Sequence, residues 1–146
     1  LCPDAPEACA ASPSGFQWFD LLDQSPEQIL SKSIVAETKL NKFIDEVKVE
    51  NDLRSKQIIL GGFSQGCMLT IQTGIKRKDE INSVVGYSGK IINTEHLSKN
   101  INSKPDIILM FVRTLCVINQ HAPSKFFTIR LVEREGKKIK LHYLSF

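Results

Sequence analysis

The stretch that decides the fold runs from Ile58 to Thr70 and reads I-I-L-G-G-F-S-Q-G-C-M-L-T. A short apolar run opens it, a glycine cluster follows, and apolar residues at a helix-compatible spacing complete it. This order predicts a β-strand, a sharp turn that carries Ser64, and an α-helix. Strands that alternate with helices imply a parallel sheet with right-handed crossovers, so the stretch indicates an α/β fold.

Within this stretch, Gly62-Phe63-Ser64-Gln65-Gly66 fits the pattern G-x-S-x-G. In the nucleophile elbow of α/β-hydrolases this pattern holds a serine in a strained backbone conformation. We expect glycine at positions 62 and 66 because a side chain at either one would collide with the neighbouring strand or helix. The N–H of Gln65 would then bind the oxyanion of a tetrahedral intermediate. In the alternative interpretation, Ser64 only caps the helix of a glycine-rich turn.

Two further matches accompany the elbow, one on each side of it. They are Pro3-Asp4-Ala5-Pro6 leading to Trp18-Phe19-Asp20-Leu21, and Gly86-Tyr87-Ser88-Gly89. In this order the three segments resemble the phospholipase/carboxylesterase family of α/β-hydrolases, which includes acyl-protein thioesterases. The resemblance covers residues 1 to 110. It implies a cytoplasmic serine hydrolase that acts on small carboxylic esters or acyl thioesters through a triad of serine, aspartate and histidine.

The remaining patterns extend the α/β interpretation. Ser25-Pro26-Glu27-Gln28 predicts the start of an amphipathic helix, with the serine as cap and the glutamine closing a capping box. Two further helices are expected, at Gln65 to Ile75 and at Phe126 to Glu135, the second ended by Gly136. Strands are expected at Gln57 to Gly61, Asn82 to Tyr87, Asp106 to Val112 and Lys138 to Leu144. We expect a mostly parallel sheet with helices on both faces.

Composition limits the class of protein. With 146 residues, 42% of them hydrophobic, the chain is expected to form a single domain over residues 1–146. A formal charge of +3 is too small and too scattered to indicate nucleic acid or an anionic membrane as partner. No segment approaches the ~20 apolar residues of a membrane span, and no signal peptide opens the chain.

The cysteines predict no metal site. Cys2, Cys9, Cys67 and Cys116 lie at irregular spacings, without C-x-x-C or paired histidines, so we expect free thiols and no cofactor. Cys67 falls in the first turn of the elbow helix, where the helix dipole lowers the pKa of a thiol. We nevertheless expect it to serve in packing, since the family usually has a small residue there.

The triad acid is absent from the place where the resemblance puts it. Family members carry an H-G-x-x-D-type turn after the strand that ends here near Val112. No carboxylate occurs between Asp106 and Glu133. Asp106 precedes its strand, so we expect it at the opposite edge of the sheet from Ser64. No residue is therefore assigned as the acid.

No histidine takes the position of the triad base. We expect His142 in the middle of a strand and His96 in a polar loop. His121 lies in the segment from Arg113 to Pro123, which lacks the family pattern and is expected to be irregular. It is the weak candidate for a base, because only an accidental fold of that segment would bring it to Ser64.

These gaps suggest a partial α/β-hydrolase domain, truncated at both ends. By resemblance, a strand ahead of Leu1 should lie beside the elbow strand and supply a second oxyanion N–H, and without it backbone groups of the elbow strand stay unpaired. Two functions remain open: a serine hydrolase that is impaired in this chain, and a catalytically inactive or fragmentary domain that at most binds acyl ligands or a partner protein. The oligomeric state is left open.

Overall fold

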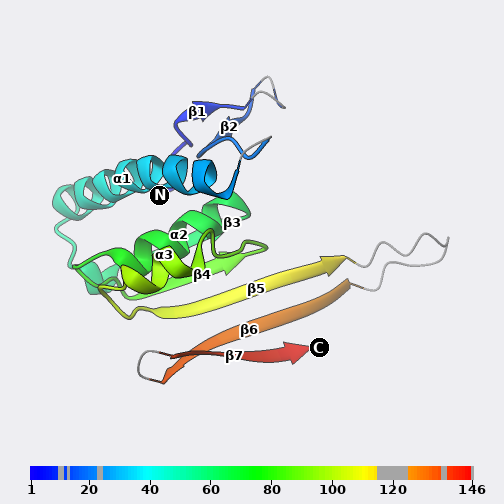
Figure 1. Ribbon diagram of the computed structural model, residues 1–146. Coiled ribbons are helices and arrows are strands. Elements are labelled where there is room, and N and C mark those ends of the chain that lie inside the picture. The colour runs from blue at the N-terminus through cyan, green and yellow to red at the C-terminus, as the bar shows by residue number, and fades with distance from the viewer. Residues whose placement is uncertain (10–11, 13, 23–24, 115–124, 136–137, 146) are drawn as a thin grey trace.

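A computed structural model describes residues 1–9, 12, 14–22, 25–114, 125–135 and 138–145 (Figure 1). A small antiparallel hairpin comes first, made of β1 (Glu7–Ala8) and β2 (Phe16–Gln17). The main body follows in the order α1 (Pro26–Glu50), η1 (Ser55–Gln57), β3 (Ile59–Phe63), α2 (Gln65–Lys76), β4 (Ser83–Tyr87), α3 (Thr94–Lys99), β5 (Asp106–Thr114), β6 (Lys125–Glu135) and β7 (Lys138–Ser145). The alternation of strand and helix up to β5 is that of an α/β fold, as predicted.

The main sheet has the order β3-β4-β5-β6-β7. Strands β3, β4 and β5 are parallel, whereas β6 and β7 are added as antiparallel strands. All four predicted strands are present, within a few residues of their expected bounds. The prediction of a mostly parallel sheet therefore holds for β3 to β5 and not for the strands that follow them.

The predicted helix from Phe126 to Glu135 is wrong, because these residues form β6. This segment is rich in aromatic and β-branched residues, which favour a strand when neighbours are available for pairing. It pairs with β5 on one side and with β7 on the other, so two ladders stabilise the extended form. Gly136, the expected helix stop, lies outside the described residues.

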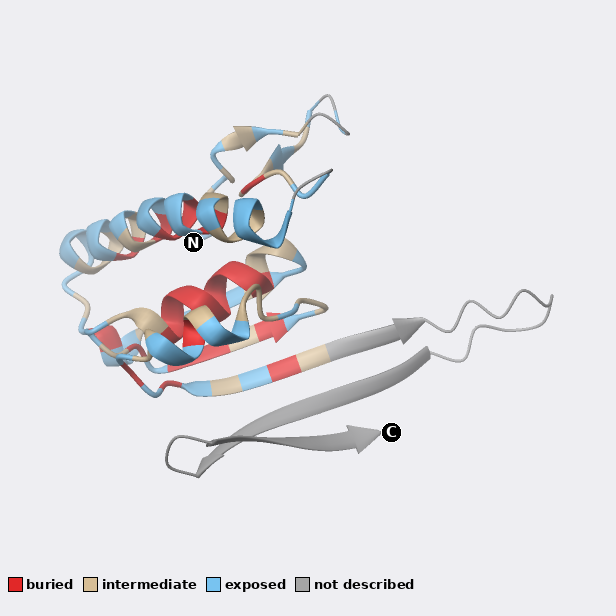
Figure 2. Ribbon diagram, viewed as in Figure 1, coloured by how far each residue is buried: buried red, intermediate tan, exposed pale blue. Residues whose placement is uncertain are grey.

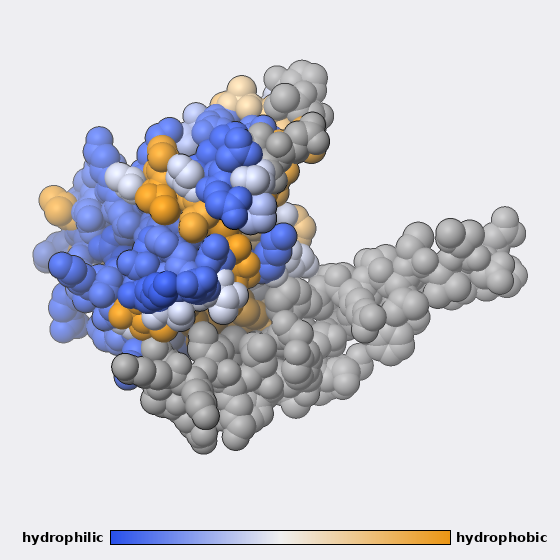
Figure 3. All heavy atoms as spheres, viewed as in Figure 1, coloured by the Kyte–Doolittle hydropathy of each residue, from blue (hydrophilic) through white to orange (hydrophobic). Residues whose placement is uncertain are grey.

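The described helices lie on one side of the sheet (Figure 1). Helix α2 packs against β3 and β4, and α1 and α3 pack in turn against α2. In the view of Figure 3, hydrophilic side chains cover most of this helical layer, and apolar ones gather between the helices. The expectation of helices on both faces is therefore wrong for the part of the chain that is described. None of the described helices is long and apolar enough to span a membrane.

Helix α1 starts as its sequence predicts. The Ser25 hydroxyl accepts a hydrogen bond from the backbone N–H of Gln28 at 3.3 Å, and the Gln28 side chain accepts one from the Ser25 N–H at 2.9 Å. This is the expected capping box. It fixes the start of the helix that covers α2.

Helix α2 is the centre of the core. Every residue from Cys67 to Ile75 is buried, which colours most of this helix red in Figure 2. Leu69 is fully enclosed, as is Val84 on the facing strand β4. Because the turn that carries Ser64 leads directly into α2, the packing of this helix fixes the position of the turn.

The other face of the parallel strands is uncovered by the described residues. Its exposed apolar side chains are Ile59 (60% exposed), Phe63 (71%), Tyr87 (42%) and Ile108 (37%). They alternate along β3, β4 and β5 with residues that pack towards α2, as expected for strands with a period of two. We call this surface the outer face. Parallel sheets are normally covered on both faces, so an exposed outer face is unusual.

Candidate active site

Ser64 lies on a tight turn between the end of β3 and the start of α2, as predicted. Its backbone has φ 53° and ψ −113°, outside the regions that residues with a side chain normally adopt. Strain of this kind persists only where the surrounding structure enforces it, and it is concentrated at functional sites. The Ser64 side chain makes no capping hydrogen bond to α2 and is exposed. The alternative interpretation, in which this serine only caps the helix, is therefore wrong.

Backbone contacts on both sides hold this turn. The N–H of Ser64 donates to the carbonyl of Tyr87 at 2.8 Å, and its own carbonyl accepts from the N–H of Met68 at 3.1 Å. A Cβ at Gly62 would lie 2.6 Å from the backbone nitrogen of Cys67 and closer still to the carbonyl carbon of Gly66. Glycine at position 62 is therefore required by the close approach of the helix, as expected.

Gly66 differs from the expectation. A Cβ at this position would meet no atom within 4 Å. The predicted collision is absent because Gly66 borders an open cavity rather than a neighbouring element. The requirement for glycine at position 66 is thus wrong for the structure as described.

The segment Gly86-Tyr87-Ser88-Gly89, which also matches the family pattern, lies against the turn. Cys67 is buried, and a Cβ at Gly89 would lie 2.5 Å from its Cβ and 2.9 Å from the carbonyl oxygen of Ser64. Gly89 is therefore small so that the Cys67 side chain can fill the space beneath the turn. Burial raises the pKa of the Cys67 thiol, and a hydrogen bond from the backbone of Gly89 opposes this effect only in part. The packing role of Cys67 is supported, and the suggested lowering of its pKa is wrong.

The Gln65 side chain ties the amino-terminal segment to the turn. Its amide oxygen accepts from the backbone N–H of Trp18 at 3.2 Å, and its amide nitrogen donates to the carbonyl of Phe19 at 2.7 Å. Sequence reasoning considered only the backbone of Gln65 and missed this bridge. The one signal for it was the co-occurrence of the Trp18-Phe19 match with the elbow in a single family pattern.

We expect Gln65→Ala to release the amino-terminal segment. The carbonyl of the buried Phe19 would lose its partner, which costs about 1 to 3 kcal/mol in unfolding free energy. Trp18 is the only tryptophan, so its emission spectrum, recorded along a urea titration, reports the change. Gln65→Glu keeps an acceptor for the Trp18 N–H but loses the donor and sets a carboxylate oxygen against the Phe19 carbonyl, so it should destabilise the chain at least as much. Equal stabilities for all three chains would contradict the bridge.

The other side chains proposed or examined for the triad lie elsewhere. Asp106 begins β5 and pairs with Ser83, at the end of the strands opposite Ser64, as predicted. His96 lies in the first turn of α3 rather than in a loop, with its Nε2 3.4 Å from the Lys76 Nζ. Lys76 ends the 12-residue helix α2, about 16 Å along its axis from the turn.

Two more predictions concern the carboxyl-terminal part. His142 falls within β7, the strand expected to contain it. His121 lies outside the described residues, as does the segment expected to be irregular, apart from Arg113 and Thr114, which belong to β5. Among the described residues, no cluster of histidine, cysteine, aspartate or glutamate could hold a metal ion.

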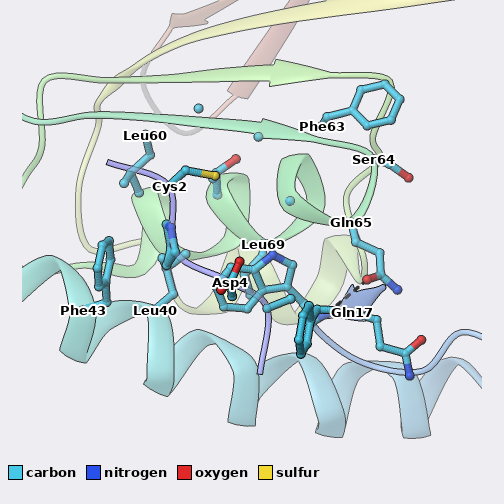
Figure 4. A pocket seen from close by; sticks show the side chains of 18 of the residues that line it. Cys2, Asp4, Gln17, Leu40, Phe43, Leu60, Phe63, Ser64, Gln65 and Leu69 are labelled. Carbon is cyan, nitrogen blue, oxygen red and sulfur yellow. Dashed lines mark hydrogen bonds between the residues drawn. The ribbon is translucent and has the colours of Figure 1, made fainter. Parts of the chain in front are cut away.

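A cavity of about 760 Å³ borders the turn. It lies between β3, α1 and the amino-terminal segment, with Ser64 at one end (Figure 4). Its lining is mainly apolar and includes Leu40 and Phe43 of α1 and Leu60 of β3. None of the described residues that line it is a histidine, so no general base faces Ser64 from there.

Fold and turn together define an α/β-hydrolase, and comparison with known proteins narrows the class. Residues 1–128 match the model of the phospholipase/carboxylesterase family, to which this chain therefore belongs. Acyl-protein thioesterase 1 of Saccharomyces cerevisiae is 35% identical over 92 residues, which are 60% of this chain and 40% of that protein. Acyl-protein thioesterase 1 homolog 1 of Dictyostelium discoideum is 24% identical over 121 residues, 75% of this chain and 52% of its own length.

A solved structure agrees with this assignment. The crystal structure of esterase PE8 superposes with a TM-score of 0.68 and 32% sequence identity, over 73% of this chain and 51% of the esterase. The chain thus spans about half the length of the relatives that it matches. Fold and family follow from these similarities.

Proposed function

We propose that this chain is a serine hydrolase domain of carboxylesterase or acyl-protein thioesterase type, with Ser64 as the nucleophile. The observation that carries the proposal is the backbone of Ser64, held at φ 53° between a parallel strand and the buried helix α2. This geometry leaves the hydroxyl exposed and without a capping bond. The substrates would be small carboxylic esters or acyl thioesters.

In the proposed reaction, the Ser64 Oγ attacks the carbonyl carbon of the substrate and gives up its proton to a base. The N–H of Gln65 belongs to the first turn of α2, where backbone N–H groups have no partner within the helix. It would donate to the oxyanion of the tetrahedral intermediate, a contribution of roughly 3 to 4 kcal/mol. Expulsion of the alcohol or thiol leaves an acyl-serine, which water then hydrolyses.

The base is the weak point of the proposal. Serine is a poor nucleophile unless an adjacent group takes its proton. No described residue combines the required chemistry with a position at Ser64. We therefore propose that the 146 residues alone are strongly impaired in ester hydrolysis.

A cytoplasmic location is also proposed, supported by the free thiols of Cys2, Cys9 and Cys67.

A second candidate function is a catalytically inactive or fragmentary domain that binds acyl ligands or a partner protein. The cavity beside β3, which is mainly apolar and contains no described histidine, favours this candidate. The two candidates predict the same fold and differ only in the reactivity of Ser64.

We expect a fluorophosphonate probe, applied in large excess for a long incubation, to modify Ser64 in preference to other serines. The strained turn exposes its hydroxyl, and the adjacent N–H of Gln65 stabilises the developing negative charge on the probe. Peptide mass spectrometry locates the adduct. Ser64→Ala is the matched control and should lose this adduct. Modification spread over other serines, or unchanged in Ser64→Ala, would support the inactive domain instead.

A further inference from the structure

Two serines follow the ends of neighbouring strands in the same way. Ser64 comes directly after β3, and Ser88 comes directly after β4. The Ser64 N–H donates to the carbonyl of Tyr87 at 2.8 Å, and the Ser88 N–H donates to the carbonyl of Met110 at 2.8 Å. Both bonds continue the parallel register in which Phe63 pairs with Tyr87 and Tyr87 with Met110. Ser88 is therefore the neighbour of Ser64 across the sheet, at a strand spacing of about 4.8 Å.

The backbones of the two serines share a second feature. Ser64 has φ 53° and Ser88 has φ 51°, in the left-handed region that favours glycine. Among the described residues, one other non-glycine residue has a positive φ, and it is Asp52 at 50°. Asp52 follows the C-cap of α1, where a left-handed residue commonly ends a helix. Ser88 follows a strand, so the ending of a helix does not account for its conformation.

The turn after β4 is shaped to lie against the turn of Ser64. A Cβ at Gly89 would lie 2.9 Å from the carbonyl oxygen of Ser64, and a Cβ at Gly86 would lie 2.4 Å from the Cys67 Sγ. Glycine therefore stands at the two positions where a close contact requires it. Position 88 lies between them and carries a side chain, although its conformation is one that glycine adopts more easily. Strained residues of this kind are concentrated at functional sites, which points to a role for the Ser88 side chain.

The Ser88 hydroxyl is available to a ligand. Ser88 is half-buried, and its hydroxyl makes no hydrogen bond to another described residue. Ligands of parallel α/β sheets bind at the carboxyl ends of the strands, where Ser64 and Ser88 both lie. A serine hydroxyl can donate one hydrogen bond, so a group bound at Ser64 would find a second donor beside it.

We propose that Ser88 is a substrate-binding residue of the Ser64 site. Its hydroxyl donates a hydrogen bond to an oxygen of the tetrahedral group that forms on the Ser64 Oγ. The inference rests on the proposed function, in which the N–H of Gln65 donates to the same group. The two donors come from different elements, since Gln65 belongs to α2 and Ser88 to the turn after β4. The ligand must present acceptor oxygens, as a carboxylic ester, an acyl thioester or a phosphonate does.

The test measures how fast a fluorophosphonate probe modifies Ser64 in the parent chain, in Ser88→Ala and in Ser88→Gly. In this reaction the Ser64 Oγ bonds to phosphorus, fluoride leaves, and the proton of the hydroxyl passes to water. Both variants lack the Ser88 hydroxyl, so both should be modified at least about tenfold more slowly, as expected for one lost hydrogen bond to a charged oxygen. Peptide mass spectrometry follows the adduct on Ser64.

Unfolding in urea separates this role from a structural one. Ser88→Gly relieves the positive φ and Ser88→Ala does not, so the glycine variant should unfold at a higher urea concentration than the alanine variant. A structural role would make the labelling rates follow these stabilities, whereas the proposed role makes both rates equally low. Asp52→Gly is the control, because it relieves the same strain ahead of β3 and should leave the labelling rate unchanged.

The phosphorus NMR resonance of the finished adduct is a second measurement that does not depend on the rate. It should shift between the parent chain and each Ser88 variant, because one oxygen of the adduct loses a donor. A parent-like labelling rate or an unshifted resonance in Ser88→Gly overturns the proposal. Absence of a Ser64 adduct in the parent chain contradicts the proposed nucleophile and this inference together. Equal labelling of the parent and both variants contradicts only the role of Ser88.

Discussion

The 146-residue chain is expected to hydrolyse an activated short-chain ester on the order of 10⁶-fold more slowly than a family member with a complete triad. Without a base, the neutral hydroxyl of Ser64 is too weak a nucleophile to add much to the rate. The N–H of Gln65 and substrate binding would then supply most of the remaining acceleration. The measurement is kcat/KM for a nitrophenyl ester of a short acid, beside Ser64→Ala, whose rate should be nearly the same.

Rapid turnover that disappears in Ser64→Ala would contradict this expectation. It would mean that a base reaches Ser64 from residues outside the described part, and His121 would be the first candidate. Comparison of His121→Ala with His96→Ala then identifies it, because His96 contacts Lys76 at the far end of α2 and should have no effect on turnover.

Gly62→Ala is expected to lower the unfolding free energy by at least about 3 kcal/mol, at the upper end of overpacking penalties. The added Cβ would meet backbone atoms of Gly66 and Cys67, which cannot move aside as a flexible side chain could. The strained turn would have to shift away from α2. Urea unfolding followed by circular dichroism measures the loss.

Gly66→Ala is the control for this prediction. Its Cβ meets nothing within 4 Å, and the residue lies in α2, where alanine is preferred over glycine by up to about 1 kcal/mol. We expect the stability of this variant to equal or exceed that of the parent chain. Equal destabilisation by the two alanines would mean that the elbow pattern itself, rather than the contact at Gly62, requires the glycines.

The turn could be predicted from sequence because its signals are local. An apolar run, glycines and a helical pattern occur within 13 consecutive residues, Ile58 to Thr70, and each agrees with the others. The error at Phe126 to Glu135 has the opposite cause. A strand there depends on pairing with both β5 and β7, and pairing across the sheet does not show in the periodicity of the segment itself.

Within the site, local and distant contributions again differ. The position of Ser64 and the backbone role proposed for Gln65 follow from neighbouring residues. The bridge from the Gln65 side chain spans 46 and 47 residues to Phe19 and Trp18, and no spacing rule connects them. The prediction for Gly66 was wrong because it assumed a neighbouring element that the described structure does not place there. The absence of a triad acid, and of a base other than the weak candidate His121, remains a prediction.

The outer face bears on how long this polypeptide would survive in a cell. Ile59, Phe63 and Tyr87 present apolar surface beside an edge of β3 that no described strand pairs, the combination that chaperones and proteases act upon in incompletely folded chains. A change of about 1 to 2 kcal/mol in the free energy of unfolding alters the fraction of unfolded molecules enough to change abundance in a cell several-fold. The steady-state level of this chain would therefore depend on whether something covers that face, more than on the packing of its core around α2.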